Sequence, residues 1–187
     1  MREALKLLTL SGLLEARRGD GTYVRQEFTD FLSQQIQWSI LLSMTEVDMI
    51  VEVGEGLEVK AAILAAKRAT PEDIEKIGVF RQLLDIEGRD IERETDLDLE
   101  FHNAIAKASH NVLLSSLMLS LQNILRQYIT LSNQMTDRIE TTVAEHQAVY
   151  DAIAAKDPDA AERAMKEHLT ISREWILKAP KREIEAT

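Results

Sequence analysis

Three of the four histidines in the sequence occupy positions at which a helix would turn them toward its apolar side. His102 follows Asp98 by four residues, and Phe101 and Ile105 recur beside them at the spacing of a buried helix face. Because residues four apart on an α-helix lie about 40° from each other, Asp98 and His102 should project together toward the interior. The spacing therefore predicts a buried carboxylate next to a buried imidazole.

The other two inward-facing histidines lie nearer the C-terminus, each on its own predicted helix. His146 shares a helix face with Val149, and His168 shares one with Met165. Both interrupt stripes of apolar residues that recur every three or four positions, which is the pattern of a core-facing helix. The fourth histidine, His110, falls between two predicted helices, and we expect it to be exposed.

Two interpretations fit the three inward-facing histidines. A single histidine on an apolar face is usually a packing residue of the core. A carboxylate and three imidazoles buried together are costly without a counter-charge, and a bound metal ion removes that cost for all four groups. Their oxygen and nitrogen atoms suit Zn²⁺, Ni²⁺, Mn²⁺ or Fe²⁺. A six-coordinate ion would keep two positions for a small hydroxy- or keto-carboxylate, or for a catalytic water.

Composition restricts the class of protein. The 187 residues are enough for one sizeable core, and only 7 glycines and 3 prolines favour helices over a β-sandwich. Cysteine is absent, which excludes disulfides and thiolate sites and is typical of a reducing compartment. No apolar run approaches the roughly 20 residues of a membrane span, and the charged N-terminus lacks the pattern of a signal peptide. We therefore expect a soluble cytoplasmic protein without membrane contact.

Hydrophobic periodicity predicts a chain that is helical almost throughout. A short first helix ends near Gly12, and residues 13–26 form a β-hairpin around Asp20 and its flanking glycines. Further helices are predicted over residues 28–43, 45–69, 70–86, 92–108, 112–132, 137–155 and 157–178. Gly54 and Gly56 lie close together in one of them, which suggests tight packing, a kink or a local break. The predicted fold class is all-α, an antiparallel bundle of six to seven helices after a short helix–hairpin fragment.

Charge is distributed unevenly along the chain. The formal net charge is −10, but the first 27 residues carry 5 basic and 4 acidic side chains, whereas the remainder carries 17 and 28. An acidic body repels nucleic acid, so only the N-terminal piece is compatible with binding DNA.

Three stretches of the sequence resemble one family of transcription regulators. MREALKLLTLSGLLEARRGDGTYV resembles the second half of a GntR-type winged helix-turn-helix, in which R-E-A-L ends the recognition helix and G-x-G-T-x-V forms the wing. DLDLEFHNAIAKASHNVLL and EHQAVYDAIAAKDPDAAERAMKEHL resemble the two signatures of the FCD effector domain in the FadR branch of that family. The resemblance implies a partial winged helix over residues 1–26, an all-helical FCD domain that binds ligand and metal over 27–178, and a tail over 179–187.

The resemblance also implies specific site residues. In the FCD pattern one aspartate and three histidines hold a divalent metal, with zinc as the first expectation and nickel, manganese or iron as the others. The matching positions are Asp98, His102, His146 and His168. The positions expected to contact DNA are Arg2, Arg18 and Gly19. The family further implies a homodimer on operator DNA and a small carboxylate as the effector.

The chain departs from the family pattern at three places. It begins inside the recognition helix, so the two helices that precede it in relatives are missing, and without them it cannot be held in a major groove. Asp20 lies at the wing tip, where a carboxylate repels phosphate. Gly54 stands where relatives carry an arginine in an E-x-R pattern. Either the role of that arginine is empty here, or Arg126, within a long apolar segment, binds the anionic ligand in its place.

These observations predict a ligand-responsive transcription regulator that senses a small organic carboxylate through a bound metal. We do not expect the protein to be an enzyme. One alternative is a metal-dependent enzyme in a helical bundle, although the sequence has neither a Glu-x-x-His pair nor a His-Glu-x-x-His motif. A second alternative is a sensor or dimerisation module that does not bind DNA, which the missing helices leave open.

Overall fold

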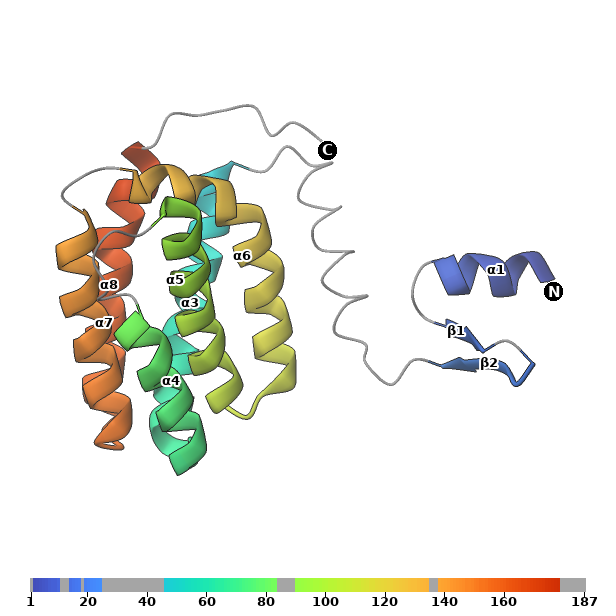
Figure 1. Ribbon diagram of the computed structural model, residues 1–187, viewed down its shortest axis with the longest axis horizontal. Helices are drawn as coiled ribbons and strands as arrows, with labels where there is room; N and C mark the ends of the chain where they lie inside the picture. The colour runs from blue at the N-terminus through green and yellow to red at the C-terminus, as the bar shows by residue number, and fades with distance from the viewer. Residues whose placement is uncertain are drawn as a thin grey trace. The chain divides into compact units, whose positions relative to one another are not determined.

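The computed structural model of the chain describes residues 2–10, 14–17, 19–24, 46–83, 90–134 and 138–178. Within these ranges the backbone forms seven helices and one two-stranded sheet (Figure 1). The chain divides into two compact units, Met1–Thr45 and Glu46–Thr187. The domain boundary predicted between residues 26 and 27 and the tail predicted over 179–187 both lie outside the described residues.

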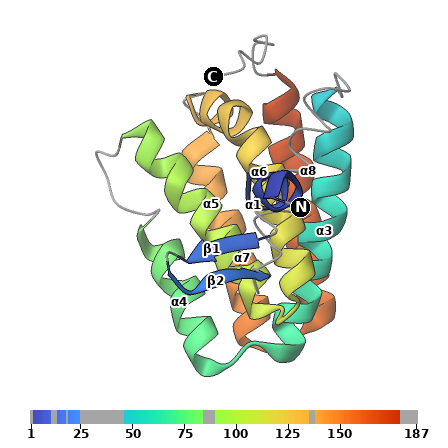
Figure 2. The ribbon, with the colours of Figure 1, turned by 90° about the vertical axis from the view of Figure 1, so that its right-hand side faces the viewer.

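The first unit contains helix α1 (Arg2–Leu10) and an antiparallel hairpin of strands β1 (Leu14–Arg17) and β2 (Gly21–Val24), seen in Figure 2. Arg17 pairs with Gly21, so a three-residue turn joins the strands. Gly19 and Gly21 have φ angles of 83° and 128°, which side chains rarely adopt. The Tyr23 hydroxyl donates to the Asp20 carbonyl at 3.1 Å and holds the turn against the second strand. The predicted first helix and hairpin are confirmed.

The second unit is a bundle of six helices. They are α3 (Val47–Arg68), α4 (Pro71–Leu83), α5 (Ile91–Ala108), α6 (Val112–Asn133), α7 (Arg138–Ala154) and α8 (Pro158–Lys178). Each begins and ends close to the predicted bounds, and the all-α fold class is confirmed. The helix predicted over 28–43 lies outside the described residues. No helix among the described residues has both the length and the apolar character that crossing a bilayer requires.

Polar side chains cap the starts of α4, α5, α6 and α8. Thr70 and Asp73 bond reciprocally, the Thr70 hydroxyl accepting from the Asp73 amide at 3.2 Å and the Asp73 carboxylate accepting from the Thr70 amide at 2.9 Å. This reciprocal pairing is a capping box. Asp90, Asn111 and Asp157 accept in the same way from amides in the first turns of α5, α6 and α8. Local hydrogen bonds thus determine where these four helices start.

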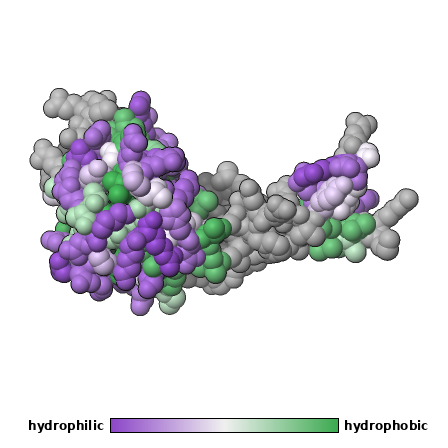
Figure 3. All heavy atoms as spheres, turned by 90° about the horizontal axis from the view of Figure 1, so that it is seen from below, coloured by the Kyte–Doolittle hydropathy of each residue, from purple (hydrophilic) through white to green (hydrophobic). Residues whose placement is uncertain are grey.

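Small side chains let α3 lie in contact with four other helices. Ala61, Ala62, Ala65 and Ala66 are fully buried, and α3 contacts α5, α6, α7 and α8. Larger apolar residues of α5, α7 and α8 fill the rest of the core. The face of this unit seen in Figure 3 is mostly hydrophilic, as its acidic composition leads one to expect.

The two glycines of α3 do not mark a close contact or a break. The helix runs continuously through Gly54 and Gly56, and a Cβ atom built on either would meet nothing within 4 Å. The predictions of tight packing and of a local break are therefore wrong. Gly54 is nevertheless buried, and the open space beside it belongs to the pocket described next.

Candidate metal centre

The three inward-facing histidines come together in the core of the bundle. His102 comes from α5, His146 from α7 and His168 from α8, and each is at most 5% exposed. One nitrogen of each ring lies within 4.8 Å of a nitrogen of the other two. The three stripes identified in the sequence therefore converge on one point, where they form a cluster with the donor atoms of a metal site.

Carboxylates on neighbouring helices orient two of these rings. Nδ1 of His102 lies 2.5 Å from Oε2 of Glu58 on α3, and Nδ1 of His168 lies 2.8 Å from Oε2 of Glu145 on α7. The Nε2 atoms of His102 and His168 then face each other at 3.2 Å. An Nδ1–H that donates to a carboxylate fixes the tautomer and leaves Nε2 as the coordinating atom, an arrangement common behind metal-bound histidines.

Burial and pairing set the charge states of these groups. Burial lowers the pKa of His168 below its ordinary value, even though the hydrogen bond to Glu145 opposes this effect. Burial alone would raise the pKa of Glu58, but the adjoining His102 outweighs it and holds that pKa below its usual range. A neutral imidazole at 168 and an ionised carboxylate at 58 are both states that favour cation binding.

Asp98, the fourth residue predicted from sequence, lies beside this cluster and contacts one of its rings. Its Oδ1 atom lies 3.4 Å from Nε2 of His146. The Phe101 ring stacks on the His146 ring with centroids 4.2 Å apart and an angle of 18° between the planes. This contact fixes the deepest of the three imidazoles against the apolar core.

The donor set, and the spacing of one pair of its nitrogens, fit a divalent metal. Zn–N bonds are about 2.0–2.1 Å long, so two nitrogens on one ion at angles of about 90–110° stand roughly 2.9–3.4 Å apart. The 3.2 Å between Nε2 of His102 and Nε2 of His168 falls in this range. Three imidazoles and a carboxylate also match the ligand preferences of zinc and its neighbours in the first transition row.

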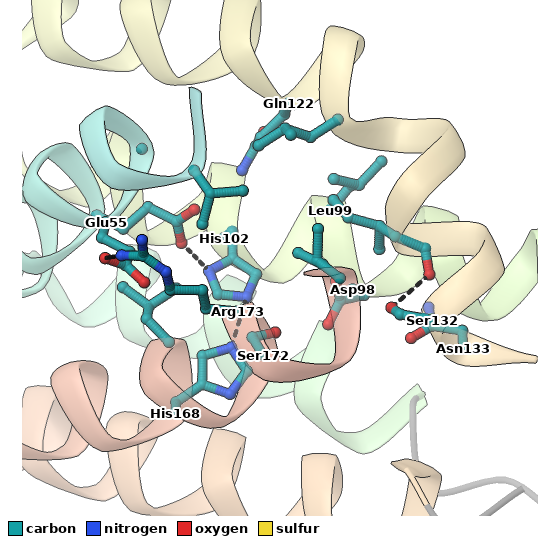
Figure 4. A pocket seen from close by; sticks show the side chains of 17 residues that line it. Glu55, Asp98, Leu99, His102, Gln122, Ser132, Asn133, His168, Ser172 and Arg173 are labelled. Atoms are coloured by element: carbon teal, nitrogen blue, oxygen red, sulfur yellow. Dashed lines mark hydrogen bonds and ion pairs between the residues drawn. The ribbon is translucent and has the colours of Figure 1, made fainter. Parts of the chain in front are cut away.

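A pocket of about 600 Å³, its open mouth included, leads from this cluster to the surface. Figure 4 shows His102 and His168 at its centre, with Gln122 reaching in from α6 and Arg173 lying on α8. Asp98 also lines the pocket, whereas His146 lies behind the lining. A small molecule in the pocket would therefore meet one side of the cluster.

The arginine of this pocket differs from the one predicted. Arg126 does not line it, because its guanidinium pairs with Asp96 at 2.6 Å and Glu92 at 3.5 Å on the neighbouring helix. These two acids, on α5, hold the side chain away from the histidines, and the ligand-binding role predicted for Arg126 has no support in this arrangement. Arg173, five residues after His168 on α8, lines the pocket instead.

Sequence reasoning missed Glu58, Glu145 and Arg173. Glu58 lies four residues after Gly54 and four before Ala62, both buried, so its place on the inner face of α3 was readable as an acid in an apolar stripe. Glu145 is next to His146 in the sequence, and an α-helix turns neighbouring side chains about 100° apart, so the two do not face each other. The partner of Glu145 is on another helix, and no local spacing indicates such a pair.

The residues predicted to contact DNA belong to the first unit. Arg2 opens α1, Gly19 lies in the hairpin turn, and Arg18 lies outside the described residues. Their role in binding DNA stays a prediction.

Comparison with known proteins identifies the family. Residues 49–170 match the FCD domain. The chain is 34% identical over 177 residues to the HTH-type transcriptional regulator LutR of Bacillus subtilis (strain 168), covering 91% of this chain and 80% of that protein. It is 35% identical over 178 residues to the putative L-lactate dehydrogenase operon regulatory protein of Escherichia coli (strain K12), covering 91% of this chain and 68% of that protein.

A solved structure agrees with this assignment. Streptococcus agalactiae GntR superposes with a TM-score of 0.66 at 25% identity, covering 92% of this chain and 80% of that one. The relatives are transcription regulators and not enzymes. The chain therefore belongs to the GntR-type transcription regulators that carry an FCD domain.

Proposed function

We propose that the FCD domain of this regulator senses a small hydroxycarboxylate through a divalent metal held by Asp98, His102, His146 and His168. Zinc is the metal that the donor set suits best, with nickel, manganese and iron as alternatives. The metal would supply a positive charge and open coordination positions at the inner end of the pocket.

One observation carries the proposal. Nε2 of His102 and Nε2 of His168 lie 3.2 Å apart, while the Nδ1 atoms of both rings face carboxylates. If both rings are neutral and donate through Nδ1, two nitrogen lone pairs confront each other in a buried site. A cation between them turns this repulsion into two bonds.

The pocket supports a carboxylate as the effector. Asp98, His102 and His168 line its inner end, so a ligand that enters from the surface reaches the metal position directly. A carboxylate with a hydroxyl on the adjacent carbon can chelate through two oxygens. L-lactate, for which the Escherichia coli relative's operon is named, has this chemistry and is the natural first ligand to test.

The regulator would bind operator DNA as a homodimer. It would do so through a winged helix of which α1 and the β1–β2 hairpin are parts. In a winged helix of this kind, the recognition helix enters the major groove and phosphate contacts make affinity fall with salt. A regulator of this class acts where the chromosome is, in the cytoplasm.

Thermal unfolding with L-lactate, compared between zinc-loaded and chelator-stripped protein, tests the metal and the effector together. We expect lactate to raise the midpoint of the zinc-loaded protein and to leave the stripped protein unchanged, because only the loaded site offers coordination. Equal stabilisation of both samples would mean that the acid does not bind the metal. A purified protein that contains no metal and takes up none on titration would overturn the proposal.

A further inference from the structure

The pocket is richer in negative than in positive charge. Among the described residues that line it, Arg173 is the one side chain with a permanent positive charge, against the carboxylates Glu55, Glu58 and Asp98. A divalent cation at the histidine cluster would make the net charge of this lining zero and would not make it positive. A ligand carboxylate is therefore attracted at the metal position itself, and a second one finds no comparable excess of positive charge.

The one cation of the lining is already neutralised. Nη1 of Arg173 donates to Oε2 of Glu55 at 3.3 Å, and Nη2 donates to Oδ1 of Asp48. Two carboxylates thus share one guanidinium, and the three groups together carry a net negative charge. To bind a ligand carboxylate, Arg173 would have to break its ion pair with Glu55 or Asp48. The released carboxylate would stay nearby and repel the ligand carboxylate.

Neutral polar groups make up the remaining hydrogen-bonding surface. Gln122 is 5% exposed, its side chain reaches into the pocket in Figure 4, and its Oε1 atom has no hydrogen-bond partner among the described residues. Ser132, Asn133 and Ser172 line the same space. An uncharged amide with unmet hydrogen-bonding capacity suits a hydroxyl group, which both donates and accepts.

We infer that this pocket selects a monocarboxylate with a neutral, hydroxyl-bearing tail and rejects dicarboxylates, and that Glu55, by occupying Arg173, is a residue that determines this specificity. The inference rests on the proposed function and names the chemical class of its effector. One carboxylate of the effector binds the metal, and uncharged groups of the effector occupy the remainder of the pocket.

A matched pair of acids tests this selectivity. 2,4-Dihydroxybutanoate and malate share a carboxylate and an adjacent hydroxyl, and they differ in whether the fourth carbon is a CH₂OH or a second carboxylate. Titration calorimetry on the zinc-loaded chain should give a dissociation constant for dihydroxybutanoate that is at least about tenfold lower than the one for malate. Zinc content measured after each titration excludes removal of the metal by the acid.

Glu55→Gln removes one of the two acids from Arg173 and leaves Asp48 in place. We expect it to shift the ratio of the two dissociation constants toward malate by roughly three- to tenfold, because a like charge near the second carboxylate is lost. Glu52→Gln makes the same charge change on an exposed position of α3 that does not line the pocket, and should leave the ratio unchanged.

The outcomes separate this inference from the proposed function. If lactate and dihydroxybutanoate bind but malate binds as tightly, or if Glu55→Gln leaves the ratio unaltered, the selectivity is wrong and the metal-dependent sensor stands. If none of the three acids binds the zinc-loaded protein, the proposed function fails, and the inference fails with it.

Discussion

Oε2 of Glu145 lies 2.8 Å from Nδ1 of His168, although the two residues are 23 positions apart and come from different helices. The pair is buried, with both side chains at most 10% exposed. A carboxylate in this position holds the imidazole in one orientation and one tautomer, with Nε2 turned toward His102.

Glu145→Gln should therefore weaken metal binding without removing a ligand. Loss of such an orienting carboxylate typically lowers metal affinity about 10–100-fold. Competition with a chromophoric zinc chelator measures this change. Glu167→Gln, next to His168 in sequence but exposed, is the matched control and should bind zinc like the unaltered chain. If the two variants bind zinc with equal affinity, Glu145 does not orient His168 for metal binding.

Replacing a ligand should have a larger effect. His146→Ala and His168→Ala should each reduce zinc to well below one ion per chain, because each leaves three of the four proposed ligands and opens a hole in a preorganised site. Metal analysis of the purified variants, with circular dichroism to establish that they fold, provides the measurement. His110→Ala alters an exposed histidine that pairs with Asp73 and should retain the metal. Full metal content in His168→Ala would contradict the site.

The capping box of α4 gives a pH-dependent contribution to stability. Hydrogen bonds from the Thr70 backbone amide and hydroxyl lower the pKa of Asp73 below the ordinary 3.8 of an aspartate, with His110 adding to the effect. The folded state therefore favours the ionised carboxylate. Its stabilisation is complete well above pH 3.8 and is lost as the pH falls through the lower pKa of the folded state.

Asp73→Asn should consequently be less stable than the unaltered chain by about 1 kcal/mol at neutral pH. The difference should shrink as the pH falls below 3.8. Urea unfolding at a series of pH values gives both quantities. Glu75→Gln, on an exposed position of the same helix, should show no such dependence. A difference for Asp73→Asn that stays constant down to pH 3 would mean that the charge of Asp73 is irrelevant to the cap.

Two helical glycines should respond differently to replacement by alanine. Gly56 lies inside α3 with nothing within 4 Å of an added Cβ, so Gly56→Ala should stabilise the bundle by roughly 0.5–1 kcal/mol. At Gly78 the same atom would lie 3.2 Å from Cε2 of Tyr150, and the ring would have to move. Gly78→Ala should therefore gain nothing or lose stability. Chemical denaturation compares the two, and a larger gain at Gly78 would contradict this packing argument.

The sequence allowed the helices and the inward-facing histidines to be predicted because both depend on local periodicity. His102, His146 and His168 each interrupt an apolar stripe, and a stripe identifies the buried face without knowledge of the neighbouring helices. Helix starts were equally readable, since residues such as Thr70 and Asp157 bond amides two or three positions away.

Pairs between helices were not predictable in this way. Arg126 stood in an apolar segment, but Asp96 and Glu92, at least 30 positions away on α5, determine where its guanidinium lies. Arg173 reaches the pocket beside acids more than 100 positions away on α3. One-dimensional spacing carries no information about such partners, so the three buried histidines could be predicted and the charges around them could not.

Gly54 is a position in the pocket wall where a larger side chain can be introduced without disturbing the packing of the core. It is buried in α3 and lines the pocket, yet a side chain there would begin in open space. Most positions on the inner face of a bundle are constrained by close packing, so a mutation that alters their volume destabilises the fold. At Gly54 a larger residue would shorten the pocket while also favouring the helix. The size of molecule that this pocket admits can therefore change through a single substitution at Gly54, with no compensating change elsewhere.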